Sequence, residues 1–456
     1  MNAPMVILGT TLLLAALVVA LRREALASWL AASLGAGLVA GVVFLAKPDA
    51  AILPLGGTWV LLGRSLELSD ANRAIVGFVY LVAGFMFLGA RAARPGRLFN
   101  AAGLLATGLA AASLMAVPFL YAALFLEGMA LVCVLLLYPP ERGPARGPLR
   151  MVVLYTLGMM ALLTAGWQAE SLGAGTVSAG AARATTVLAV LGFAMLLAAP
   201  PFHLWFPSAA SHSHPYSLAF VILIAQAGAL FLVLRFFDAY AWLRQDQGLF
   251  DAARWTGIAI AAFASVWAMA QRSLARTAVY AVMADTAVVL LAFSARSVEG
   301  FQLVLGLSAA RVIGLGVWSL GASTLQNAGA GDTADGLAGI AYRAPLPTAA
   351  IIVGLLSIAG FPLTAGFPGR WAVMAGGGPA AYAVVGAIAA VSLAAVRWTS
   401  TALRTPLEGD VPYPGVLERF FLVAGILLCL LLGLFPQLLY PWVIGAMSGL
   451  SGLTGG

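Results

Sequence analysis

The chain has 456 residues, of which 62% are hydrophobic and 9% charged, and its mean hydropathy is +0.99. This composition excludes a soluble globular protein, because no soluble fold needs so much apolar surface. The formal net charge of +7 does not indicate a nucleic-acid partner, since the charged residues lie mainly in short segments between apolar stretches.

The apolar stretches predict an all-α polytopic membrane protein, because a membrane-spanning helix needs about 20 apolar residues. We expect about fourteen transmembrane helices, joined by loops that are too short for a soluble domain or a nucleotide-binding fold. The first segment lacks a basic leader and a small-residue cleavage site, so we expect it to be retained rather than removed as a signal peptide. In chain order the expected spans are 5–21, 27–45, 74–90, 100–116, 118–137, 150–167, 184–199, 216–237, 255–271, 276–294, 301–323, 347–375 (broken), 379–399 and 417–440.

The basic residues are divided unevenly between alternate loops. If the loop with Arg22 and Arg23 is cytoplasmic, that side holds 14 of the 24 Lys and Arg residues, the other side holds 8, and 2 lie within spans. This bias follows the positive-inside rule and predicts both termini on the outer, periplasmic side. One lysine, Lys47, among so many arginines is typical of a GC-rich bacterial genome, and hence of a bacterial cytoplasmic membrane. Further basic residues on the cytoplasmic side include Arg91, Arg94, Arg97, Arg142, Arg146 and Arg150.

Two apolar segments are interrupted by proline and glycine in the same way. The proline pairs Pro201–Pro207 and Pro362–Pro368 are each six residues apart, and a buried-looking acid, Glu127 or Asp285, precedes each segment. Interrupted segments in corresponding positions of two halves indicate an inverted repeat around an ion or substrate path, although proline and glycine are also common in ordinary membrane helices. We expect helix breaks within 198–208 and 360–369, formed by Pro200, Pro201, Pro207, Pro362, Gly366 and Pro368.

Ionisable residues inside apolar stretches need a reason, because a charge at the bilayer centre costs a few kcal/mol. Glu127 has no basic residue within one turn, so it is either a proton-relay or charge-coupling acid or a structural acid bonded to a neighbouring helix. Asp285 is expected to pair with Arg311 or Arg370. An arginine stays protonated at ordinary pH, so these two residues can bias a path but cannot relay a proton.

The histidines and cysteines give no sign of a metal or a disulfide. His203, His212 and His214 have no carboxylate among them and do not have the spacing of a zinc site, and Cys133 and Cys429 are far apart within apolar stretches. No nucleophile–base pair, phosphate loop or cofactor motif is present, so we expect no cofactor, no metal and no active site of the chain's own.

Three segments resemble the antiporter-like membrane subunits of respiratory complex I, a family shared with Mrp-type cation/proton antiporters and membrane-bound hydrogenases. Residues 201–207 (Pro-Phe-His-Leu-Trp-Phe-Pro) look like the family's Pro-Phe-His-x-Trp-x-Pro loop. Residues 274–280 resemble its Leu-Lys-Arg-x-x-Ala-Tyr segment. Residues 355–370 resemble its Leu-x-Gly-x-Pro-x-x-x-Gly-Phe-x-Gly-Lys segment.

The resemblance implies fourteen helices with two inverted five-helix repeats, each with a broken helix. It places an N-terminal three-helix segment at 1–98, the repeats at 99–237 and 255–399, and a C-terminal helix and tail at 400–456. The chain ends soon after its last span, which is similar to the shorter subunits that lack a long lateral helix.

The family moves protons along a line of buried lysines and glutamates, and the resemblance implies which residues hold those places here. The fifth-helix glutamate corresponds to Glu127, and a histidine of the tenth helix corresponds to Asp285. The lysines of the seventh, eighth and twelfth helices fall at Leu196, Gln226 and Arg370. The chain therefore resembles a member that keeps the fold signature and has lost the titratable lysines.

These features favour an antiporter-like subunit of a multisubunit complex that couples redox chemistry or ion exchange to proton movement. Its partners are expected to be other integral membrane subunits, and its own role structural or charge-coupling rather than that of a full proton channel. The path or coupling residues are expected to be Glu127, Gln226, Asp285, Arg311, Arg370 and His203. The alternative is an autonomous secondary transporter or ion/proton symporter that binds its substrate at the two breaks. The few polar residues near the breaks speak against it.

Overall fold

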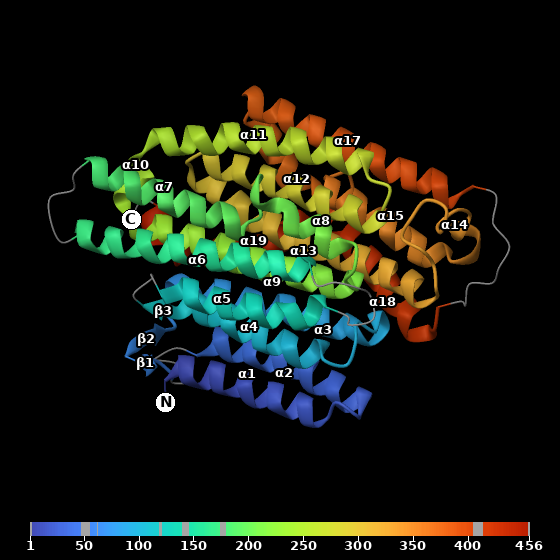
Figure 1. Cartoon of the computed structure of the whole chain (residues 1–456), viewed down its shortest axis with the longest axis horizontal. Coiled ribbons are helices and arrows are strands. Elements are labelled where there is room, and N and C mark those ends of the chain that lie inside the picture. The colour runs from blue at the N-terminus through green and yellow to red at the C-terminus, as the bar shows by residue number, and fades with distance from the viewer. Residues whose placement is uncertain are drawn as a thin grey trace.

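The computed structural model describes residues 2–46, 55–61, 63–117, 121–138, 146–173, 179–404 and 414–454, so Lys47 and Arg142 lie outside the described residues. Most of the long helices run side by side along the longest axis of the molecule (Figure 1). The helices are α1 (Ala3–Ala20), α2 (Ala25–Leu45), α3 (Asp70–Ala93), α4 (Phe99–Met115), α5 (Ala122–Leu137), α6 (Arg146–Gly173), α7 (Ala179–Leu196), α8 (Trp205–Ala210), α9 (Pro215–Ala239), α10 (Ala241–Gln245), α11 (Gln247–Ala270), α12 (Leu274–Ser294), α13 (Val298–Asn327), α14 (Ile340–Arg343), α15 (Pro345–Ala359), α16 (Phe367–Ala375), α17 (Gly378–Ala402), α18 (Val416–Leu434), α19 (Tyr440–Ser448) and α20 (Ser451–Thr454).

The expected all-α membrane architecture is confirmed. Among the described residues, 10 helices are long and apolar enough to cross a membrane. The apolar helices 99–115, 122–137, 180–196 and 345–359 are shorter, and together the two sets match the expected spans one to one. The protein is therefore a multi-pass membrane protein.

Both termini lie at one end of the bundle, whereas the α1–α2 turn and α14 lie at the other (Figure 1). A small antiparallel sheet also lies at the terminal end, with β1 (Thr58–Leu61), β2 (Arg64–Glu67) and β3 (Ala116–Val117) in that order. Thr58 pairs with Glu67, and Ser65 pairs with Val117. The sequence did not predict this sheet, because strands of two to four residues are too short to show an alternating pattern.

Helix α9 is the central element of the fold. The whole of its apolar 18-residue window is buried, and it packs against α3, α4, α5, α7 and α13. A helix that is surrounded on every side carries apolar residues all round, which is the pattern of this segment. Gln226 is a polar residue near the middle of this buried helix. Since it is 2% exposed, its amide must find partners inside the protein.

Both proline-rich segments interrupt helical structure. Helix α7 ends at Leu196, a 3₁₀ turn spans Phe202–Leu204, and α8 follows before α9 starts at Pro215. Helix α15 ends at Ala359. The next residue, Gly360, has a φ of +83° that favours glycine, and α16 starts at Phe367.

The expected last span, 417–440, is longer than the observed helix. Helix α18 stops at Leu434, and a 3₁₀ turn at Pro436–Leu439 separates it from α19. Pro436 explains the difference, because proline lacks a backbone N–H and its ring disfavours helical geometry in the preceding residue.

Candidate functional site

The centre of the second half holds three buried charges in direct contact. Asp285 on α12 lies between Arg311 on α13 and Arg370 on α16, and the three side chains are 3–5% exposed. Arg311 Nε donates to one carboxylate oxygen of Asp285, and Arg370 Nη2 donates to the other. The expected pairing of Asp285 with Arg311 or Arg370 is confirmed, and both arginines take part. Counted at ordinary protonation, the cluster carries one excess positive charge.

Gln226 connects this cluster to the first half of the chain. Arg311 Nη1 donates to Gln226 Oε1 over 2.6 Å. The Gln226 amide nitrogen lies 3.3 Å from the Thr286 hydroxyl and 3.4 Å from the carbonyl oxygen of Leu197, just beyond the end of α7. One neutral side chain on α9 therefore contacts both the ion cluster and the first helix break.

Arg370 also satisfies backbone carbonyls at the second break. Its Nη1 donates to the Gly366 carbonyl over 2.8 Å, and its Nη2 donates to the Ile358 carbonyl. A Cβ added at Gly366 would lie 1.9 Å from the Ser357 carbonyl oxygen, and one added at Gly360 would lie 2.0 Å from Arg370 Cδ. Glycine is therefore required at both positions for the guanidinium to reach the break.

Neutral groups occupy the corresponding place at the first break. The Tyr155 hydroxyl on α6 donates to the Leu196 carbonyl over 3.2 Å, and Gln226 reaches the Leu197 carbonyl. The Leu196 side chain is buried at 1% exposure and carries no proton. The freed carbonyls at the end of α7 are thus bonded by neutral donors, although the oxygen of the same Gln226 amide accepts from Arg311.

Glu127 lies apart from the cluster on α5. Its side chain is partly buried, and Oε1 accepts a hydrogen bond from the Thr156 hydroxyl on α6 over 2.9 Å. No Lys or Arg within the described residues forms an ion pair with it. Since Thr156 is next to Tyr155, α6 brings Glu127 and the first break to the same stretch of helix, but no hydrogen bond joins them directly.

His203 lies in the 3₁₀ turn of the first break and is 8% exposed. Its ring packs against Phe263 and Tyr280, with centroids 5.2 and 6.3 Å away, and its Nδ1 has no hydrogen-bond partner in the described part of the chain. Nowhere in that part do three His, Cys, Asp or Glu side chains gather to hold a metal ion.

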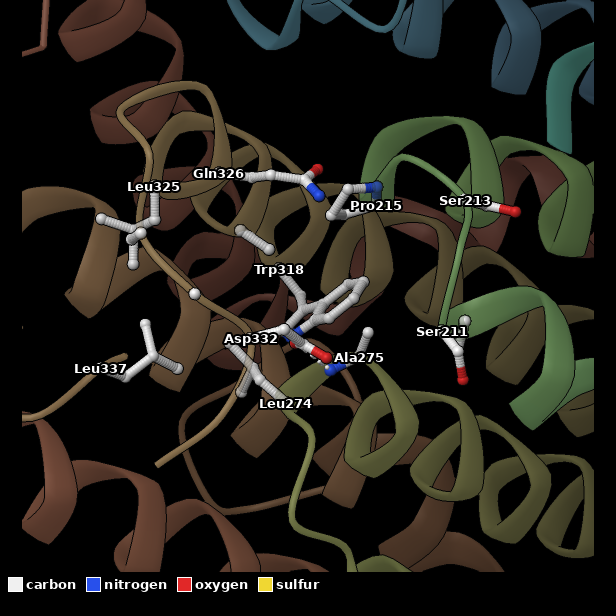
Figure 2. Close-up of a pocket in the computed structure, with 14 residues that line it drawn as sticks. Ser211, Ser213, Pro215, Leu274, Ala275, Trp318, Leu325, Gln326, Asp332 and Leu337 are labelled. Atoms are coloured by element: carbon white, nitrogen blue, oxygen red, sulfur yellow. Dashed lines mark hydrogen bonds between the residues drawn. The ribbon is translucent and has the colours of Figure 1, made fainter. Parts of the chain in front are cut away.

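A cavity of about 110 Å³ opens beside Trp318, and its lining includes Asp332 and Leu337 from the segment that leads to α14 (Figure 2). Trp318 and Gln326 both line it, and their Nε1 and Oε1 atoms are buried without a partner among the described residues. An unpartnered buried polar group is costly, and the cavity is large enough for several water molecules. The cavity therefore has both the volume and the polar side chains to hold water.

Asp332 closes this cavity from the loop between α13 and α14. Its carboxylate accepts hydrogen bonds from the Ser273 hydroxyl and from the Ala275 amide, the latter over 2.9 Å. Burial raises the pKa of the Asp332 carboxyl, and these hydrogen bonds oppose the increase. Sequence reasoning missed Asp332, because a single loop aspartate carries no pattern.

Arg311, Trp318 and Gln326 share one face of α13. They are seven and eight residues apart, about two helical turns in each case. Arg311 Nη2 is buried without a partner in the described part of the chain, as are Trp318 Nε1 and Gln326 Oε1. Polar atoms in need of hydrogen bonds thus recur along this face for about 22 Å, from the cavity to the ion cluster.

Of the residues predicted from sequence, Gln226, Asp285, Arg311 and Arg370 come together, whereas Glu127 and His203 lie outside their hydrogen-bond network. Tyr155, Thr156 and Thr286 were missed. Hydroxyl side chains are frequent on membrane helices, and only the packing shows which of them meet a charge or a free carbonyl.

This fold, with its interrupted helices and buried ion cluster, agrees with a comparison against known protein families. The chain matches the family described as NADH:quinone oxidoreductase/Mrp antiporter, TM, over residues 150–396, which is more than half of its length, and it belongs to that family.

Particular relatives are NADH-quinone oxidoreductase subunit N proteins. The one from Methylococcus capsulatus is 30% identical over 196 residues, which are 42% of this chain and 39% of that protein. The one from Ectopseudomonas mendocina is 30% identical over 234 residues, which are 48% of this chain and 46% of that protein. The matched region spans about half the length of these curated relatives or less.

Solved structures share the fold over almost the whole chain. A chain of respiratory complex I from Thermus thermophilus with bound NADH aligns with a TM-score of 0.78 at 23% identity, covering 100% of both chains. A chain of the archaeal membrane-bound sulfane sulfur reductase aligns with a TM-score of 0.82 at 15% identity, covering 99% of this chain and 98% of that one. A chain of the Mrp complex from Dietzia sp. aligns at 0.78 and 18% identity, covering 98% of this chain and 52% of that one.

Proposed function

We propose that this protein is an antiporter-like subunit of a multisubunit membrane complex that couples redox chemistry or ion exchange to proton movement. Its partners are other integral membrane subunits. Within the complex it acts as a structural or charge-coupling subunit rather than as a full proton channel. The observation that carries this proposal is the central cluster, in which the charged groups are two arginines and an aspartate bonded to both of them.

A proton path needs groups that gain and lose a proton during turnover, and this cluster is poorly suited to that task. Arginine does not release its proton at ordinary pH. Both oxygens of Asp285 accept hydrogen bonds from guanidinium groups, and the next group along the line, Gln226, is a neutral amide. The cluster can, however, respond to a field, because its excess positive charge lies in a medium of low dielectric constant.

An autonomous transporter is less well supported. The charged groups and Gln226 at the two breaks bond one another or backbone carbonyls, and few polar groups remain for a solute. Arg311 Nη2, His203 Nδ1 and Ser357 Oγ have no partner in the described part of the chain, and water molecules can satisfy such single groups. The similar chains of known structure also come from multisubunit complexes.

The internal repeat remains part of the proposal, with 99–237 and 255–399 as its two copies. Matching helices by order sets α4, α5, α6, α7 and α9 against α11, α12, α13, α15 and α17. The contacts then correspond: α4 packs on α5 and α9 as α11 packs on α12 and α17, and α6 packs on α7 as α13 packs on α15. Glu127 and Asp285 fall on the matched helices α5 and α12, which supports the pairing of the two halves.

The proposed orientation places the termini on the periplasmic side of a bacterial cytoplasmic membrane. The α1–α2 turn with Arg22 and Arg23 lies at the end opposite to the termini, together with α14 and Arg343. Arginine-rich ends of membrane proteins face the cytoplasm. A cysteine-accessibility assay with Ser451→Cys and Arg23→Cys in intact cells tests this, and labelling of position 23 alone would contradict it.

Proton stoichiometry tests the function. The assembled complex is reconstituted in vesicles, and protons moved per turnover are compared with the number expected from its antiporter-like subunits. We expect a deficit of about one subunit's share. A full count would overturn the proposal. Glu127→Gln then separates the two roles, because a structural acid leaves coupling unchanged and a charge-coupling acid does not.

A further inference from the structure

A second pocket lies at the end of the bundle that carries the α1–α2 turn. Its volume is about 240 Å³, and it is bounded by the start of α2, the end of α3, the α3–α4 turn and the start of α4. It is remote from the ion cluster in sequence and uses none of the cluster's residues. Its polar lining residues are Arg22, Ser28, Trp29, Arg91, Arg94, Arg97 and Asn100.

The pocket gathers positive charge from three segments. Arg22 comes from the α1–α2 turn, Arg91 from the last turn of α3, and Arg97 from the α3–α4 turn. Within the described residues these three arginines form no ion pair, whereas Arg94 pairs with Glu418 over 2.7 Å. Three guanidinium groups without a carboxylate partner are suited to bind an oxyanion such as a phosphate through bidentate hydrogen bonds.

Two further features bear on the ligand of this pocket. Helix α4, with 17 residues, begins beside the pocket. Of its first four backbone N–H groups, those of Phe99 and Ala102 bond the carbonyls of Gly96 and Leu98, which leaves two that can face a ligand. The Asn100 side chain lines the pocket, and its buried Oδ1 has no partner in the described part of the chain; this oxygen is an acceptor, so it suits a headgroup hydroxyl or a water molecule rather than a phosphate oxygen. The pocket therefore offers charged and neutral donors together.

The position of the pocket in the membrane and its apolar neighbours indicate that the phosphate belongs to a lipid. The pocket lies where α1, α2, α3 and α4 end, which is the level of the headgroups for helices that cross a membrane. Trp29, an amphipathic residue typical of that level, forms one wall and donates from Nε1 to the Leu88 carbonyl over 3.1 Å. Leu88 and Leu81 on α3 are 44% and 48% exposed and continue towards the membrane centre as a surface for an acyl chain.

We propose that this pocket binds the headgroup of an anionic phospholipid, with Arg22, Arg91 and Arg97 on its phosphate and the exposed leucines of α3 along its acyl chain. Basic pockets between transmembrane helices on the cytoplasmic side take anionic lipids in this way. The lipid stabilises the contact between the N-terminal three helices and α4.

The test uses the purified full chain in nanodiscs that contain phosphatidylglycerol and phosphatidylethanolamine in equal amounts. Native mass spectrometry then measures which lipid the protein retains. We expect selective retention of phosphatidylglycerol, and a roughly 30-fold weaker binding in Arg91→Gln/Arg97→Gln. This fold-change corresponds to about 1 kcal/mol for each arginine near the anionic headgroup, at a factor of ten per 1.4 kcal/mol.

The matched control is Arg343→Gln/Arg404→Gln, which removes the same charge from the same end of the bundle but not from the pocket. An equal loss of lipid in this control would show a general surface effect and overturn the proposal. Retention of both lipids in equal amounts would also overturn it, as would displacement of the lipid by inorganic phosphate alone, because a free phosphate would then be the ligand. Equal thermal stability of the two double variants in detergent excludes misfolding as the cause.

Discussion

The two helix breaks solve the same problem with different chemistry. At each break backbone carbonyls lose their helical donors inside the membrane, where water is scarce and an unsatisfied group costs several kcal/mol. At the first break the donors are the neutral side chains of Tyr155 and Gln226. At the second break the donor is the guanidinium group of Arg370, which brings a positive charge and needs Asp285 beside it.

The comparison shows that satisfying the free carbonyls at a helix break does not require a charged side chain. Neutral donors are sufficient for the backbone, so the charges at the second break have another purpose or are retained at a cost in stability. The first break has kept the proline pattern without a charge, which is why the two segments look alike in sequence and differ in electrostatics. Four substitutions test this contrast.

Asp285→Asn is expected to have the largest effect. It leaves Arg311 and Arg370 buried without a counter-charge, and breaking a buried ion pair on one side costs about 3–5 kcal/mol. Thermal unfolding in detergent and the yield of assembled complex measure the loss. Asp285→Asn combined with Arg370→Met is expected to recover part of it, because one buried charge is removed as well. Unchanged stability of Asp285→Asn would show that the cluster is not a mutually dependent unit.

Gly366→Ala tests whether the backbone of the second break must fit closely around Arg370. The new Cβ would lie 1.9 Å from the Ser357 carbonyl oxygen, so the break has to shift, at a cost of about 1–3 kcal/mol. Gly386→Ala on α17 is the matched control, because nothing lies within 4 Å of its Cβ, and helix propensity favours alanine there. If both variants unfold at the same temperature, the close fit at the break is refuted.

Gln226→Leu tests the link between the neutral and the charged break. It removes the acceptor of Arg311 Nη1 and the donor to the Leu197 carbonyl, and an unpartnered buried group costs about 1–3 kcal/mol. Gln226→Glu keeps the shape and supplies a carboxylate to Arg311, so it is expected to lose less stability than Gln226→Leu. The reverse order in thermal unfolding would mean that the amide contributes by packing rather than through Arg311.

Glu127→Gln is expected to have the smallest effect on stability, below about 1 kcal/mol. The amide oxygen of glutamine can still accept the hydrogen bond from Thr156, and no ion pair within the described residues is lost. The change in unfolding temperature is compared with that of Asp285→Asn. A loss as large as that of Asp285→Asn would place Glu127 in a charge network that the present contacts do not include.

Sequence reasoning predicted the candidate site in part. Asp285, Arg311 and Arg370 were identifiable because a charge inside an apolar stretch needs a partner, and few partners exist in this composition. That Asp285 bonds both arginines depends on how α12, α13 and α16 cross, which no local pattern records. The same holds for Gln226: its contact with Arg311 makes a lysine at this position unfavourable, since two cations would then face each other over about 2.6 Å.

The sequence by itself determined the class of protein, the number and order of the spans and the positions of the two proline-rich breaks, but not the end of the last span. These features follow from local causes: apolar length sets a span, and proline and glycine interrupt it. Only the tertiary structure decided which polar groups meet. The cavity beside Trp318, the basic pocket lined by Trp29 and the short sheet of β1, β2 and β3 bring together residues from distant segments. Such contacts arise from long-range packing, which a one-dimensional pattern does not contain.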